Sequence, residues 1–168
     1  MLTKEQNVET LSAFRKWMLL ISVTLATTIY SMTVLIVSVV LPQMQGTLSA
    51  TPDQISWVMT FNILATAVVT PLTGWLTSRF GWRKVMLTGV FGFCVATVLC
   101  GQADSLETLV FYRVLQGGLG APLVPLAQAV LLDSFERRQH GLVTSIFGMG
   151  VVVGPIIGPV FGGYLSEL

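Results

Sequence analysis

The sequence predicts an all-α fold, a polytopic bundle of about five transmembrane helices. Composition is the first observation: 53% of the 168 residues are apolar, 10% are charged, and the mean hydropathy is +0.78. That is too little charge to cover a soluble globule of this size. The spacing of the charges is the second observation. Roughly 20 apolar helical residues cross a bilayer core, and the charge-free stretches of about that length or more are 17–52, 54–78, 85–103, 114–132 and 139–166.

The first span is predicted over 17–41, after a polar tail at 1–16. Its apolar stretch is longer than the core of a signal peptide, which has about 7 to 15 residues, and further spans follow it. We therefore expect it to stay in the membrane as the first helix of one bundle over 17–168. Pro42 is expected to open the loop that follows.

The second span, predicted over 53–77, begins with a helix-start pattern. Thr51 can cap the helix, Pro52 suits its first position, and Asp53 places a negative charge in the electropositive first turn. A third span is predicted over 85–103.

Two further spans complete the predicted bundle. Ser105 lies in a short acidic loop and marks the start of a fourth span over 107–132. The fifth span is predicted over 141–165.

The basic residues favour one orientation in the membrane. Eight of the nine Lys and Arg residues lie in the tail, the loop after the second span or the loop after the fourth span. All three places are on the same side of a chain that crosses the membrane at each span. Because cytoplasmic loops carry an excess of Lys and Arg, the amino terminus is expected in the cytoplasm.

A short basic turn joins the second and third spans, with the sequence Gly74-Trp-Leu-Thr-Ser-Arg-Phe-Gly-Trp-Arg-Lys84. Gly74 is expected to let two helices approach closely near the membrane surface. Gly81 is expected to adopt the positive φ angle that a sharp turn often needs.

Arg113 is the one basic residue inside a predicted span, roughly 9 Å along the fourth helix from its outer end. Its side chain could extend to the outer interface. Alternatively it could face a water-filled cavity, because ionisable groups within membranes generally mark pathways. Gln116 lies one turn further on the same face and favours the cavity, and Asn62 on the second span is a candidate partner.

Glycine recurs every four residues along the fifth span. This spacing keeps the glycines on one helix face, where a second helix can approach closely. The face is either a plain packing surface or part of a bent gate helix that controls access to a cavity. We call its four glycines the glycine strip: Gly150, Gly154, Gly158 and Gly162.

Other classes of function find little support in the sequence. Cys94 and Cys100 lie about 120° apart around one helix, and His140 is the only histidine, so neither a disulfide within that helix nor a metal site is expected. The basic residues form no extended stripe for nucleic acid. Neither paired acids nor a Ser/His arrangement indicates an intramembrane enzyme, and no cofactor is expected.

Three segments, in order, resemble motifs of the major facilitator superfamily. Gly74 to Lys84 resembles its cytoplasmic signature loop, and Arg113-Val-Leu-Gln116-Gly117 resembles its fourth-helix motif. The wider pattern over about 17–165 most resembles the fourteen-helix multidrug exporters. A fifth-helix antiporter motif, typical of drug:proton exporters, is matched by Gly141, Gly150, Gly154, Pro155, Gly158, Pro159, Gly162 and Gly163.

The resemblance implies roles for particular residues. Ser78 stands where the family commonly has Asp, so Asp133 becomes the expected ion-pair partner of Arg79. Thr33 stands where exporters often have a proton-titrating Asp. The residues implied to line or orient the transport cavity are Arg113, Gln116, Asn62 and Thr33. Those implied to form a cytoplasmic latch are Gly74, Ser78, Arg79, Gly81, Arg83 and Asp133.

The function implied by the resemblance is efflux of small lipophilic molecules through a bacterial inner membrane. The proton gradient would drive it, and an adaptor would link it to outer-membrane efflux partners. A facilitator has two six-helix halves, so this chain is expected to be an incomplete amino-terminal half that needs the missing helices to transport. The alternatives are a truncated, non-transporting membrane interaction module that binds another bundle through its glycine face, and a facilitator working in uptake.

Overall fold

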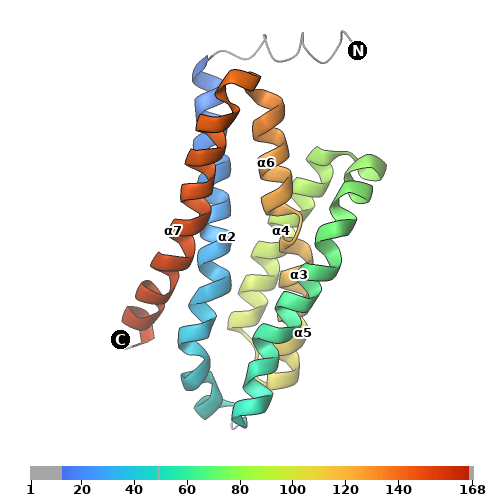
Figure 1. Ribbon diagram of the computed structural model, residues 1–168. Coiled ribbons are helices and arrows are strands. Elements are labelled where there is room, and N and C mark those ends of the chain that lie inside the picture. Colours follow the sequence, from blue (N-terminus) through green and yellow to red (C-terminus); the bar gives the residue numbers. More distant parts are fainter. Residues whose placement is uncertain (1–12, 49, 167–168) are drawn as a thin grey trace.

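A computed structural model describes residues 13–48 and 50–166, which form a bundle of long helices (Figure 1). Its helices are long and apolar enough to cross a membrane at Phe14–Gly46, Pro52–Phe80, Trp82–Gly101, Leu106–Ser134 and Arg137–Tyr164. The predicted all-α membrane bundle is therefore confirmed. Of the predicted polar tail, residues 1–12 lie outside the described residues.

The first span is a single helix, α2 (Ala13–Thr47), and it continues through Pro42. The prediction that Pro42 opens the loop is therefore wrong. A proline inside a helix removes one backbone hydrogen bond, but packing on both sides of it holds this last part of the helix together. Leu41 and Met44 both pack against the buried cluster that contains Val37.

The second span, α3 (Pro52–Phe80), begins as predicted. The Thr51 hydroxyl oxygen accepts a hydrogen bond from the Gln54 backbone N–H at 3.3 Å, and Gln54 Oε1 accepts one from the Thr51 N–H at 3.0 Å. This reciprocal pair is a capping box, which satisfies two backbone donors at the helix start.

Gly81 separates α3 from α4 (Trp82–Gly101). Its φ of 84° lies in the left-handed region that glycine adopts without steric cost, as predicted. Gly74, by contrast, does not make the close helix contact expected of it. A methyl group built on Gly74 would meet no atom within 4 Å, so this position faces open space.

The fourth span, predicted over 107–132, is not one continuous helix. It consists of α5 (Leu106–Gly120) and α6 (Leu123–Ser134), which two residues separate. Pro122 is one of these two residues and has no N–H to donate to the carbonyl of Gly118, four positions earlier. A proline ring also clashes with the preceding turn of an unbroken helix, so the break falls at this point.

The break in the fourth span divides the helices into two packed groups (Figure 1). The α5 helix packs against α3 and α4, whereas α6 packs against α2 and against α7 (His140–Ser166), which follows a short 3-10 turn at Arg137–Gln139. One buried cluster joins α2, α6 and α7: Leu20, Val23, Ala127, Leu131, Phe135, Val143 and Phe147. The other joins α2, α3, α4 and α5: Val37, Ile55, Val58, Cys100 and Leu109. Among the buried residues described, those of α2 belong to both clusters.

Basic residues gather at one end of the bundle. The amino-terminal end of α2, the turn from α3 to α4 and the connection from α6 to α7 all lie at the top of Figure 1. These segments carry Arg15, Lys16, Arg79, Arg83, Lys84, Arg137 and Arg138. The loops between α2 and α3 and between α4 and α5 lie at the opposite end and contain no basic residue.

The α7 helix lies along α2 through the glycine strip. A methyl group built on Gly154 would lie 2.6 Å from the Thr28 carbonyl oxygen, and one built on Gly158 would lie 2.8 Å from the Met32 carbonyl oxygen. The Thr28 hydroxyl also donates a hydrogen bond to the Gly150 carbonyl at 2.9 Å. Glycine therefore lets the two helix backbones touch, which is how small residues join membrane helices.

The glycine strip gives a first testable prediction. Gly158→Ala should lower the melting temperature of the purified protein, because the new methyl group would overlap the α2 backbone and overpacking typically costs about 1–3 kcal/mol. Gly148→Ala on the same helix is the matched control, since its methyl group would meet no atom within 4 Å. The control should leave the melting temperature unchanged or raise it, because alanine favours helix over glycine. Equal melting temperatures for the two variants would contradict the packing.

Candidate functional site

Arg113 lies on α5 inside the bundle and is only 7% exposed. It therefore does not extend to the outer interface, which was one of the two predicted placements. One terminal nitrogen of its guanidinium donates a hydrogen bond to Gln116 Oε1 at 2.8 Å. Its Nε is buried and has no hydrogen-bond partner among the described residues. The guanidinium is thus bound through one terminal nitrogen, and its Nε–H remains available to donate a hydrogen bond.

Gln116 connects α5 to α4. It is 1% exposed, and its Nε2 donates a hydrogen bond to the Thr97 hydroxyl at 2.7 Å. Thr97 in turn donates to the Phe93 carbonyl of its own helix at 2.7 Å. Thr97 was not among the residues predicted for the site. A hydroxyl in the middle of an apolar span was the signal for it, but sequence alone does not show that Thr97 faces Gln116.

Asn62 connects α3 to α5. Its side-chain amide donates a hydrogen bond to the Arg113 backbone carbonyl at 2.8 Å, and it is 5% exposed. Asn62 was predicted as a partner of Arg113, and the structure shows that it binds the backbone of that residue. Thr66, one turn further on α3, donates to the Gly117 carbonyl at 3.2 Å. Two side chains of α3 therefore bind backbone carbonyls of α5.

A small cleft between α2 and α3 reaches Arg113. Its lining residues are Val34, Val37, Val58, Met59, Asn62, Ile63 and Arg113. Its volume of about 10 Å³ is close to the minimum that admits one water molecule, roughly 10–15 Å³. The side chains around Arg113 therefore leave no space for a drug-sized molecule in this conformation.

The remaining predicted site residues are not part of this network. The Thr33 hydroxyl donates to the Ile29 carbonyl of its own helix at 2.8 Å. An exposed ion pair joins Arg138 to Glu136 at 3.9 Å. The expected contact between Arg79 and Asp133 therefore stays a prediction, and Arg113 has no carboxylate partner within the described part of the chain.

These features define a class of protein. Ionisable side chains within membrane helices are costly and generally mark pathways for substrates or ions. In this chain the buried guanidinium is bound by a neutral amide, and that amide is bound by a hydroxyl, at the junction of three membrane-spanning helices. The chain is thus part of a polytopic membrane protein with a polar, charged interior, as in transporters.

The chain belongs to the Major Facilitator Superfamily, whose family model matches residues 23–168. The predicted family is therefore confirmed. The chain is 39% identical over 150 residues to the multidrug export protein EmrB of Haemophilus influenzae, covering 89% of the chain and 29% of that protein. It is 37% identical over 147 residues to EmrB of Escherichia coli strain K12, covering 88% of the chain and 29% of that protein.

A third relative is named for a different activity. The chain is 40% identical over 131 residues to the fatty acid resistance protein FarB of Neisseria gonorrhoeae, covering 78% of the chain and 26% of that protein. The chain therefore spans less than a third of the length of these three relatives.

The network around Gln116 gives a second prediction. Gln116→Leu should destabilise the protein by about 1–3 kcal/mol, because the Arg113 guanidinium loses its described hydrogen-bond acceptor while it stays buried. Gln128→Leu on α6 is the matched control, since that glutamine is exposed. Thermal unfolding of both variants in the same detergent measures the difference. Equal stability of Gln116→Leu and the unmodified protein would contradict a structural role for the network.

Proposed function

We propose that this chain forms the amino-terminal part of a proton-coupled exporter of lipophilic small molecules in a bacterial inner membrane. The observation that carries the proposal is the buried pair of Arg113 and Gln116 at membrane depth in a chain of this superfamily. The names of the relatives, which include multidrug export and fatty acid resistance, support both the outward direction and an apolar class of substrate.

Arg113 is the residue to which we assign the central role. Its guanidinium is permanently charged and held in place. The Nε–H of this group has no partner among the described residues and can donate a hydrogen bond. A carboxylate or an anionic part of a substrate could bind it and be released on protonation. Because the interiors of the five spans contain no Asp or Glu, we assign proton uptake to a carboxylate outside these spans. Thr33, in the place of the expected acid, would contribute a hydroxyl to the cavity wall.

Two mobile parts complete the proposed mechanism, in which the cavity opens to each side of the membrane in turn. The α7 helix, which contains Pro155 and Pro159, would act as the gate. Its glycine strip offers α2 a smooth backbone surface along which a bend can propagate. Closure at the basic end would involve Arg79, Arg83 and Asp133 of the predicted latch. Outer-membrane partners, reached through an adaptor, would carry the substrate onward.

Replacing Arg113 tests the function directly. Arg113→Gln should reduce drug resistance of cells that express the full-length native protein to the level of cells without it, because the fixed charge is lost. Arg113→Lys should also be impaired, since lysine lacks the planar fork of donors. Resistance and efflux of a fluorescent lipophilic cation would be measured at equal membrane levels of protein. Arg138→Gln, at a largely exposed side chain, is the control and should keep full resistance. Full resistance of Arg113→Gln would refute the assigned role.

Orientation gives a further prediction, because the basic end of the bundle should face the cytoplasm. A reporter that is active only in the periplasm should work when fused after Asp104 and should be inactive when fused after Glu136. A fluorescent protein that folds only in the cytoplasm should give the opposite pattern. The reverse result at both positions would place the amino terminus outside.

A further inference from the structure

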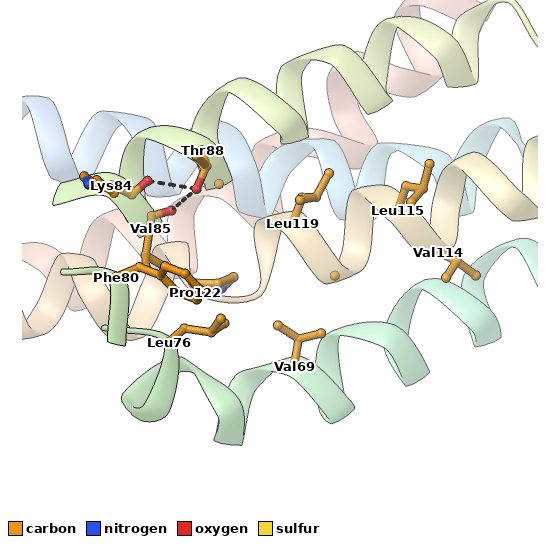
Figure 2. A pocket seen from close by; sticks show the side chains of 12 residues that line it. Val69, Leu76, Phe80, Lys84, Val85, Thr88, Val114, Leu115, Leu119 and Pro122 are labelled. Atoms are coloured by element: carbon orange, nitrogen blue, oxygen red, sulfur yellow. Dashed lines mark hydrogen bonds between the residues drawn. The ribbon is translucent and has the colours of Figure 1, made fainter. Parts of the chain in front are cut away.

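A second cavity lies between α3 and α4, away from Arg113, with α5 at its floor (Figure 2). Its volume is about 590 Å³, within the range of about 300–1000 Å³ that is usual for pockets that hold one small apolar ligand. We call it the α3–α4 groove. Its lining residues are Val69, Leu76, Phe80, Lys84, Val85, Thr88, Gly89, Val114, Leu115, Gly118, Leu119 and Pro122.

The walls of the α3–α4 groove are apolar along their length. Thr88 is the only hydroxyl residue among its lining side chains, and it donates to the carbonyls of Lys84 and Val85 at 2.8 and 3.1 Å (Figure 2). Its hydroxyl proton is therefore already used within α4. Gly118 adds no side chain to the walls, whereas Gly89 lets α4 approach the backbone of α5, because its methyl position would lie 3.1 Å from the Leu119 carbonyl oxygen.

One end of the groove is cationic. Figure 2 shows Lys84 and Phe80 together at one end, whereas Val114 lies at the other. Within residues 13–48 and 50–166, no carboxylate forms an ion pair with Lys84. Arg83 lies next to Lys84 in the chain, with its guanidinium 5.4 Å from the ring centroid of Trp82. The groove therefore opens at the basic end of the bundle, beside an ammonium group that no described carboxylate neutralises.

The length of the groove matches one leaflet of a bilayer. Along α3 it runs from Val69 to Phe80, which is about 16 Å at the helical rise of 1.5 Å per residue. Half of a hydrocarbon core that is about 30 Å thick is about 15 Å. An acyl chain of a lipid in the leaflet at the basic end would thus extend along the groove with its headgroup level with Lys84.

A volume of about 590 Å³ over this length provides enough space for an extended hydrocarbon chain. An extended hydrocarbon chain is far narrower than a helix and can enter without displacing the walls.

We propose that the α3–α4 groove binds an anionic phospholipid, with one acyl chain between α3 and α4 and the phosphate beside Lys84. Anionic lipids are attracted to basic residues at a membrane surface, and the groove supplies the complementary apolar surface. This site is separate from the network around Arg113, and the proposal does not depend on the direction or substrate of transport.

Native mass spectrometry of the full-length protein tests the proposal. After purification from nanodiscs that contain phosphatidylglycerol and phosphatidylcholine, the protein should retain phosphatidylglycerol preferentially. Lys84→Gln should reduce this preference about fivefold, the ratio that corresponds to about 1 kcal/mol for one lysine near an anionic surface. Arg138→Gln removes a charge from the same end and should leave the preference unchanged. Equal preference in the unmodified protein and Lys84→Gln would overturn the proposal.

A second measurement locates the acyl chain, first in the unmodified protein and then in two variants. Phosphatidylglycerol with a photoactivatable group near the end of one acyl chain should label the segment Val114–Leu119. Gly118→Leu should abolish this labelling by filling the groove, whereas Gly101→Leu, at a glycine with no atom near its methyl position, should not. Labelling confined to other segments would overturn the proposal. So would displacement of the phospholipid by a free fatty acid at an equal concentration, because the groove would then select a soluble amphiphile.

Discussion

The close contact between α5 and α3 at Gly117 determines the geometry of the polar interior. Any side chain at this position would collide with the backbone carbonyl of Asn62. Because the two backbones touch there, the Asn62 amide can reach the Arg113 carbonyl and Thr66 can reach the Gly117 carbonyl. These contacts hold α5 in the rotation that directs Gln116 toward Thr97 on α4. The glycine at position 117, which has no side chain, thereby determines how three helices pack against one another.

The polar interior is costly in a membrane, and its hydrogen bonds show how the cost is limited. In hydrocarbon every polar group must find a partner within the protein, and the amide and hydroxyl groups of Asn62, Gln116 and Thr97 do so. Arg113 differs, since its Nε has no partner among the described residues. A network that is otherwise satisfied is rigid and holds this donor in one place. Such fixed placement suits a group that binds and releases a partner during a transport cycle.

The sequence predicted the number of membrane spans and their helical type because charge-free stretches of membrane length are hard to place elsewhere. It also predicted Gly81 and the Thr51 cap, where local backbone chemistry decides the structure. It missed the break before Leu123 because a proline can end a helix, bend it or be tolerated, and neighbouring helices decide which occurs. The same ambiguity explains the opposite error at Pro42, where the helix continues.

Side-chain partners were predicted less well than helices. Arg113, Gln116 and Asn62 were identified because polar residues are rare in apolar spans, and they do lie together. Thr97 was missed because a threonine commonly donates to its own helix backbone, as Thr33 does. Which threonines also accept a hydrogen bond from a neighbour depends on the rotation of each helix. That rotation is set by contacts such as the one at Gly117, which join residues far apart in the chain.

The contact between α7 and α2 also has a consequence for how this protein can change in evolution. At Gly158 the opposing atoms are backbone atoms of Met32, and at Gly154 the nearest opposing atom is the Thr28 carbonyl oxygen. Every amino acid has these atoms. Residues of α2 opposite the two glycines can therefore be exchanged without removing the surface that α7 meets. The glycines themselves have no such freedom. Sequence drift should accordingly be fast on one side of this interface and slow on the other.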